Sequence, residues 1–301
     1  MFRVLLAAGV VLRILIPGLT GPTAPAATGQ RYWLGTDSSG VALAGRGPFR
    51  EPRLGGAYGG YFGMIGDWAL WQGCGHYRLA WSSADAAAAS FDLRRYGRGV
   101  GTDGYWFMGG PGVDPRYDGT VGEAAAWGAA QARRALLDLA GSHLQGGVLW
   151  MDVELPGSTV FDPVPDNGWN VVYSSTCSPR AVGQVPATLD RAELDGFAGW
   201  VRAHSGVRVG VYSSPLVWPA IFGAGPQATV HHLLEWTYTD GTASLARRPE
   251  AWCLAGTATC ARFFGGVSPT SADAAVWQWS GGGGITNGVG DFDQIDAGRL
   301  R

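Results

Sequence analysis

The chain has 301 residues, of which 46% are hydrophobic, and a formal net charge of −2 at pH 7. This hydrophobic content is enough for a packed core and excludes a chain that is disordered throughout. The sequence contains no dense basic run, so it lacks the positive surface that nucleic-acid binding requires, and a neutral or mixed-charge substrate fits better.

The first 27 residues have the features of a secretory signal. Arg3 supplies the positive charge, residues 4–12 form an apolar run, and Ala24-Pro25-Ala26 is a small-residue cleavage site. Arg13 interrupts the apolar stretch, so we expect cleavage after export and no stable membrane insertion, with a membrane-anchored form as the alternative. We therefore expect residues 28–301 to form one secreted or cell-envelope domain.

The next elements are short runs of β-branched and aromatic residues that close on small or polar residues. They predict seven strands, over 32–36, 77–81, 104–108, 148–153, 208–212, 233–238 and 274–279. Amphipathic patterns predict three helices, over 122–139, over 190–203 and, shorter, near 215–222.

Strands that alternate with helices favour parallel pairing. We therefore expect the α/β class, as an irregular (β/α) TIM-like barrel, and the alternative is an open doubly wound sheet. Two long segments without a regular pattern, 155–188 and 240–272, predict lids or binding loops, and both contain cysteines.

The four cysteines favour disulfides, because an even number in an exported chain is typical of a disulfide framework. Three pairings are possible. The short loop between Cys253 and Cys260 favours a bridge between them, which leaves Cys74 to pair with Cys177. The sequence has no Cys-x-x-Cys or His-Glu-x-x-His spacing, so we predict no metal site and no cofactor.

Side-chain alternation in the predicted strand 148–153 separates two kinds of residue. Trp150, Asp152 and Glu154 share one face, and the apolar residues Leu149, Met151 and Val153 share the other. The valines at 207, 209 and 211 repeat the apolar face in the next strand. An apolar outer face with a polar end on the inner face is typical of a barrel wall whose active site lies where the strands end.

Asp152 and Glu154 therefore project into one pocket. Like charges held close together in a partly dry site raise each other's pKa, so one carboxyl stays protonated while its partner is ionised. Glycoside cleavage requires such a pair. The alternative is that the two carboxylates only satisfy arginines or loop amides.

Three more carboxylates are candidates for the same rim. Asp37 ends the first predicted strand, and Asp291 and Asp293 lie near the end of the chain. The first strand of a barrel closes against the last, which brings the two places together. The alternatives are a turn or helix cap for Asp37 and a solvated turn for the other two.

The chain has 14 tryptophans, and several lie within or at the ends of predicted strands, among them Trp236, Trp277 and Trp279. Aromatic rings stack on sugar rings, so the set indicates a carbohydrate cleft. For any one of these side chains the alternative is packing in the core.

Five segments, taken in order, resemble the glycoside hydrolase family 25 lysozymes. They are Gly35-Thr36-Asp37-Ser38-Ser39, Tyr105-Trp106-Phe107, Met151-Asp152-Val153-Glu154, Gly210-Val211-Tyr212-Ser213-Ser214 and Trp277-Gln278-Trp279-Ser280. The resemblance implies an irregular β/α barrel that cleaves the bond between N-acetylmuramic acid and N-acetylglucosamine in peptidoglycan. It also implies that Glu154 is the acid and that Asp152, Asp37 and Asp291 line the cleft.

The first functional hypothesis is an exported glycoside hydrolase that acts on peptidoglycan or another polysaccharide. Its expected catalytic residues are Glu154, Asp152 and Asp37, and its expected substrate-binding residues are Tyr105, Tyr212, Trp236, Trp277, Trp279, Asp291 and Asp293. The second hypothesis is a barrel that binds a carbohydrate or the cell wall without catalysis, because the long loop after Glu154 and the absence of Trp-Gln after the first-strand serine depart from the family pattern. A third is a secreted domain that is structural or binds a partner.

Overall fold

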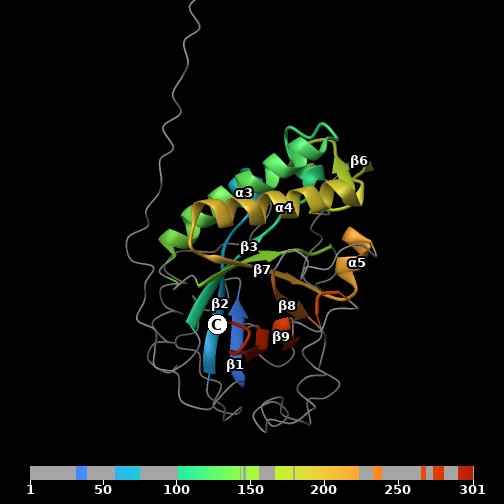
Figure 1. The fold of residues 1–301 in the computed structure, drawn as a ribbon. Coiled ribbons are helices and arrows are strands. Elements are labelled where there is room, and N and C mark those ends of the chain that lie inside the picture. The colour runs from blue at the N-terminus through green and yellow to red at the C-terminus, as the bar shows by residue number, and fades with distance from the viewer. Residues whose placement is uncertain are drawn as a thin grey trace, which may run out of the picture.

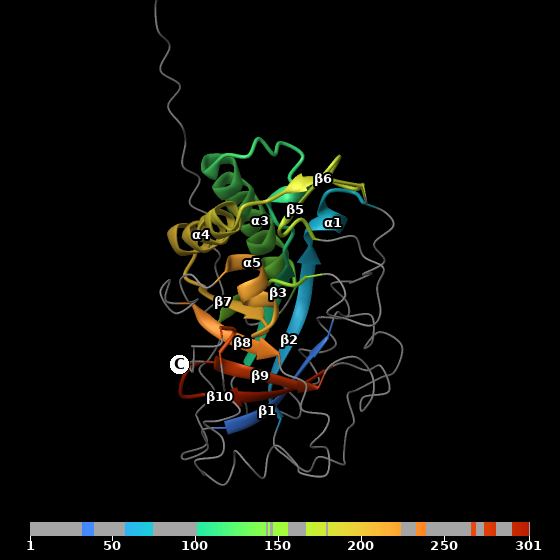
Figure 2. The same cartoon turned by 90° about the vertical axis from the view of Figure 1, so that its right-hand side faces the viewer.

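The computed structural model describes residues 32–38, 58–74, 101–142, 144, 147–155, 167–178, 180–223, 233–238, 266–268, 274–280 and 291–300. Eight of the described strands close into a barrel (Figures 1 and 2), in the order β1 (Tyr32–Ser38), β10 (Asp291–Asp296), β9 (Ala274–Ser280), β8 (Leu234–Tyr238), β7 (Arg208–Ser213), β4 (Val148–Asp152), β3 (Gly101–Phe107) and β2 (Tyr58–Asp67). Strand β1 pairs with both β10 and β2, which closes the sheet. The open doubly wound alternative is therefore wrong.

The strands are parallel except for β10, which runs antiparallel to both of its neighbours, β1 and β9. The predicted mixed α/β class is confirmed. Because of β10, the barrel departs from the all-parallel TIM arrangement. Six of the seven predicted strands are present as β1, β3, β4, β7, β8 and β9, and the seventh, over 77–81, lies outside the described residues.

Helices α3 (Val121–Gly141) and α4 (Ala187–His204) lie side by side against one side of the barrel (Figures 1 and 2) and confirm the two longer predicted helices. They approach closely where a glycine of each faces the other's backbone. A Cβ on Gly128 would lie 2.0 Å from the carbonyl oxygen of Glu193, and one on Gly196 would lie 2.1 Å from that of Ala125. The third predicted helix is α5 (Val217–Phe222).

Smaller elements follow the carboxyl ends of three strands. They are α1 (Trp68–Trp71) after β2, the 3-10 helix η1 (Pro111–Val113) after β3, and the hairpin of β5 (Val171–Tyr173) and β6 (Ala181–Gln184) after β4. The hairpin lies within the segment 155–188, for which the sequence predicted no regular structure. That part of the prediction is wrong.

The two faces of β4 pack as predicted from the alternation of its side chains. Leu149, Met151 and Val153 belong to the core between the barrel and the helices, with Phe197 of α4. Trp150, on the opposite face, packs inside the barrel. The valines 207, 209 and 211 also belong to the outer core, so the predicted barrel-wall pattern is confirmed.

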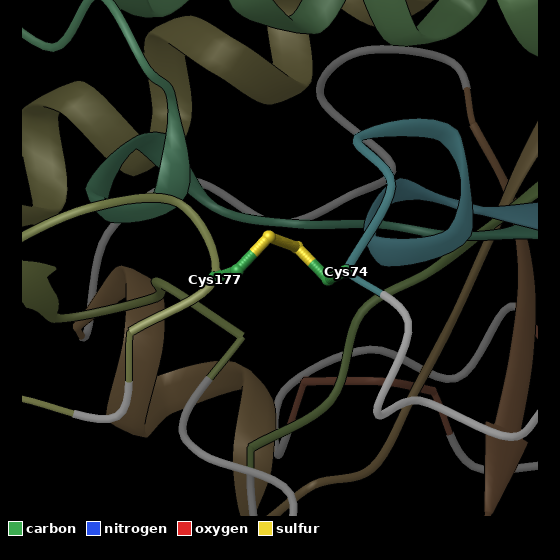
Figure 3. The surroundings of a disulfide bond; sticks show 2 residues. All are labelled: Cys74 and Cys177. Carbon is green, nitrogen blue, oxygen red and sulfur yellow. A yellow bond between two sulfur atoms is a disulfide. The ribbon is translucent and has the colours of Figure 1, made fainter.

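A disulfide joins Cys74, which follows α1, to Cys177, which follows β5 (Figure 3). The bond confirms the predicted long-range pairing and spans a sequence separation of 103 residues. Cys253 and Cys260 lie outside the described residues. In the part of the chain that the structure describes, no helix has both the length and the apolar character needed to cross a membrane.

Candidate active site

Asp152 is the last residue of β4, and its main chain is held by both neighbouring strands. The N–H of Met108, after β3, donates to the Asp152 carbonyl at 3.0 Å, and the N–H of Val153 donates to the carbonyl of Tyr212 in β7 at 3.0 Å. The two hydrogen bonds extend the strand pairing past the end of β4. Glu154 follows two residues later, so its side chain leaves the chain on the same face as that of Asp152.

The two carboxyl groups interact directly. Asp152 is buried, with 6% of its surface exposed, whereas Glu154 is half-buried. Burial raises the pKa of Asp152 well above its ordinary value, and the charge of Glu154 and a hydrogen bond to it raise that pKa further. Burial and the neighbouring charge thus both favour the protonated form of Asp152, and the hydrogen bond joins its carboxyl group to that of Glu154.

The register of the barrel places two aromatic side chains on either side of Asp152. Phe107 of β3 and Tyr212 of β7 are its partners in the neighbouring strands, and both pack against the cluster inside the barrel. Of the aromatic residues predicted to bind substrate, Tyr212 is thus adjacent to the acidic pair, whereas Tyr105 lies beside Trp150, two residues earlier in β4.

Asp37 and Asp293 lie on strands that the barrel brings together, as predicted. Asp37 is buried in β1 and is paired in register with Asp291 of β10. Asp293 is fully buried and accepts a hydrogen bond of 2.9 Å from Nε1 of Trp236. Because Asp291 and Asp293 belong to a strand, the alternative of a solvated turn is wrong for both.

Trp236 is the centre of an aromatic cluster inside the barrel. Its ring contacts Phe62, Tyr105, Trp150 and Tyr212, with centroid distances from 4.7 to 5.9 Å. Trp236, Trp277 and Trp279 are buried, with 2 to 3% of each side chain exposed. This burial matches the core-packing alternative, and contact of these rings with a glycan stays a prediction.

Sequence reasoning missed Asp67, the last residue of β2. It is buried and is the register partner of Phe107, which in turn pairs with Asp152. Residues paired across neighbouring strands project to the same face, so Asp67 faces the same side of the sheet as Asp152, two strand spacings or about 10 Å away. The glycine-rich sequence around it gave no strand signal.

A second group of acids lies behind the rim, between α3, α4 and the chain after β3. Glu193 and Gln131 are fully buried, and Nε2 of Gln131 donates to Glu193 at 2.6 Å and to the carbonyl of Gly109 at 2.7 Å. Burial raises the pKa of Glu193 well above its ordinary value and that of the neighbouring Asp190 to about 8. These residues were not predicted, because nothing in a helical pattern shows which polar side chains face inward.

Among the described residues, no group of three or more His, Cys, Asp or Glu side chains is placed to hold a metal ion. The acidic pair at the end of β4 is arranged to move a proton, because its two carboxyl groups are hydrogen-bonded to each other and differ in exposure. That arrangement suits acid and base chemistry on a polar bond brought to the rim.

No family model matches the chain. It is similar to the solved structures of a muramidase from Acremonium alcalophilum (14% identity, 89% of this chain and 96% of that chain, TM-score 0.49), a lysozyme from Streptomyces coelicolor (14%, 89% and 94%, 0.46) and a lysozyme from Aspergillus fumigatus (13%, 88% and 93%, 0.47). The last is described as a family GH25 lysozyme, the family that the sequence motifs resemble. At these identities, the chemistry of the site has to come from the residues of this chain.

Proposed function

We propose that the protein is an exported glycoside hydrolase that cleaves a cell-wall polysaccharide by carboxylate acid and base chemistry. The observation that carries the proposal is the hydrogen-bonded pair of Asp152 and Glu154 at the carboxyl end of β4, two carboxyl groups of unequal exposure. The sequence motifs support the same function, since their resemblance implies a muramidase-like barrel.

In this proposal Glu154 is the general acid, because it is the more exposed of the two carboxyl groups. We place the transferred proton on Glu154, where the hydrogen bond to Asp152 lets the two carboxyl groups exchange it, and a glycosidic oxygen accepts the hydrogen bond from Glu154. The proton then moves to that oxygen, the bond from the sugar carbon to the oxygen breaks, and the electron pair leaves with the oxygen. The negative charge left on the pair stabilises the positive charge that develops on the sugar. The oxygen of a water molecule then bonds to the sugar carbon, and the proton that this water loses returns to the pair, which completes the hydrolysis.

The remaining predicted residues have supporting roles. Asp37 and Asp291 come from the strand pair that closes the barrel, and we propose that they bind polar groups of the sugar at the rim. Asp293 is fully buried, and we propose that it acts from inside the barrel by holding Trp236. Tyr212 is proposed as an aromatic contact, because the register places it beside Asp152.

The test is the release of reducing ends from purified peptidoglycan by the wild-type protein and by Glu154→Gln. The variant keeps the size of the side chain and removes its acid, so we expect its rate to fall about 10²-fold to 10⁴-fold. The matched control is Asp195→Asn, which neutralises an exposed carboxylate on α4 and is expected to keep the wild-type rate.

Full activity in Glu154→Gln would show that Glu154 is not the acid. Absence of activity in the wild-type protein would refute the hydrolase. In that case, binding of the wild-type protein to insoluble peptidoglycan would identify the non-catalytic barrel as the correct hypothesis.

A further inference from the structure

Asn167 connects the main chain of Glu154 to the chain that follows β3. Its Nδ2 donates to the Glu154 carbonyl at 3.1 Å, and its own carbonyl accepts the N–H of Gly110 at 2.6 Å. Only 2% of the Asn167 surface is exposed. The register pairs of β4 end at Asp152, and the hydrogen bond from Val153 to Tyr212 follows them, so the Asn167 hydrogen bond holds the next residue, Glu154.

Close backbone contacts between residues 168–171 and residues 110–112 set the position of Asn167. Gly168 has a φ of 82°, and its carbonyl accepts the N–H of Gly112 at 3.0 Å. A Cβ on Gly110 would lie 2.6 Å from the carbonyl carbon of Gly168, and one on Gly112 would lie 1.8 Å from the carbonyl oxygen of Val171. The backbone of the segment that carries Asn167 therefore packs directly against the backbone of residues 110–112.

The same short stretch after β3 also holds the other half of the acidic pair. The N–H of Met108 donates to the Asp152 carbonyl, and the amide group of Gln131 binds both the N–H and the carbonyl of Gly109, at 3.0 and 2.7 Å. Residues 108–110 thus connect the main chain of Asp152 directly, and that of Glu154 through Asn167, to the buried Gln131 in the middle of α3.

We propose that Asn167 is a positioning residue that keeps the carboxyl group of Glu154 against that of Asp152 by fixing the Glu154 main chain. Its effect on catalysis rests on the proposed function, whereas its effect on the geometry of the pair does not. A displacement of about 1 Å at a reacting group can cost about 10²-fold in rate. Removing the amide is therefore expected to lower kcat and to change KM little.

The activity test compares Asn167→Ala with Asn170→Gly. Asn170 lies in the same segment, but its Nδ2 donates to the carbonyl of Ala220 in α5, and glycine accepts its φ of 63° without strain. We expect kcat of Asn167→Ala to fall about 10-fold to 100-fold with KM within about twofold, and Asn170→Gly to keep the wild-type kcat. Equal losses in the two variants would overturn the proposal.

Asn167→Asp adds a readout that a loss of folding would not produce. When protonated, its carboxyl donates an O–H to the Glu154 carbonyl as the amide N–H does, and when ionised it cannot. The ratio of its kcat to that of the wild type is therefore expected to rise as the pH falls, while the ratio for Asn167→Ala stays constant. A constant ratio for both variants would contradict the positioning role.

A ¹³C NMR titration of the Asp152 carboxyl tests the geometry without activity. If Glu154 moves away in Asn167→Ala, Asp152 loses a neighbouring charge and a hydrogen-bond acceptor, and its titration midpoint falls. It stays at the wild-type value in Asn170→Gly. An unchanged midpoint in a folded Asn167→Ala protein would refute positioning, even if the wild type cleaves peptidoglycan. A lowered midpoint in Asn167→Ala, together with no activity in the wild-type protein, would support positioning and refute the hydrolase.

Discussion

Replacing Asp190 by asparagine is expected to stabilise the protein at alkaline pH and to leave its stability unchanged in acid. Asp190 is fully buried in the first turn of α4. Burial raises its pKa from 3.8 to about 8, although the backbone N–H of Asn170 and the charge of Arg191 both favour the ionised form. The other charged and titratable groups that face it are Glu193 on the same helix and Tyr117 from the chain before α3.

The sign of the effect follows from which state holds the proton. Below about pH 4 the carboxyl is protonated in both the folded and the unfolded chain, so it contributes no pH dependence. Between pH 4 and 8 the folded protein keeps a proton that the unfolded chain releases, and the free energy of unfolding falls as the pH rises. One pKa unit corresponds to about 1.4 kcal/mol, so the difference of about 4 between the two pKa values costs at most about 5 kcal/mol above pH 8.

Asparagine has nearly the shape of the protonated acid and cannot ionise, so Asp190→Asn removes this cost. The assay is urea unfolding followed by tryptophan fluorescence at pH values from 4 to 9. We expect equal stabilities near pH 4 and a growing advantage for the variant up to pH 8. A difference between variant and wild type that does not change with pH would refute the reasoning.

Two further predictions concern stability. Gly128→Ala places a Cβ 2.0 Å from the carbonyl oxygen of Glu193, so we expect a loss of about 3 kcal/mol in urea unfolding. Gly199→Ala, on an exposed helical position with open space, is expected to gain about 1 kcal/mol, and a loss in both variants would contradict the packing argument. Replacing Cys74 and Cys177 together by alanine releases a closed loop of about 100 residues and is expected to cost about 4 kcal/mol in the same assay, whereas an unchanged free energy of unfolding would show that the bridge adds no stability.

Sequence patterns predicted those strands whose residues alternate regularly between two apolar environments. In β4 and β7 one face packs against α3 and α4 and the other lines the barrel interior, so both faces select for β-branched or aromatic residues. Glu154 and Asp152 were found for the same reason, because they continue the inner face of a clear strand.

Strand β2 was missed because its sequence has four glycines, which weaken any strand signal. The structure gives a reason for one of them. A Cβ on Gly66 would lie 2.7 Å from the ring of Trp106, so the strand has no side chain where the neighbouring tryptophan needs the space. Sequence alone does not show which large residue a glycine accommodates.

Strand β10 was missed for a different reason. Three aspartates in six residues resemble a solvated turn, yet Asp293 is fully buried and its carboxylate accepts the indole N–H of Trp236. The partner that satisfies this buried carboxylate is Trp236, which lies 57 residues earlier in the chain. Buried polar pairs of this kind depend on long-range contacts, which local patterns do not encode.

The long segment after Glu154 illustrates how local and distant sequence combine at the site. The lid or binding loop that the pattern predicted over 155–188 stays a prediction, and the described residues from 167 onwards are joined to the barrel end. Asn167 holds the Glu154 carbonyl, and Cys177 is bonded to the chain after β2 (Figure 3). The strand thus determines the face on which Glu154 lies, while a residue 13 positions later fixes its main chain. A substitution in this segment can therefore change the geometry of the acidic pair while both carboxyl groups stay in place chemically. For that reason substitutions at Asn167 separate the effect of geometry from the loss of an acid, which substitutions of Asp152 or Glu154 do not.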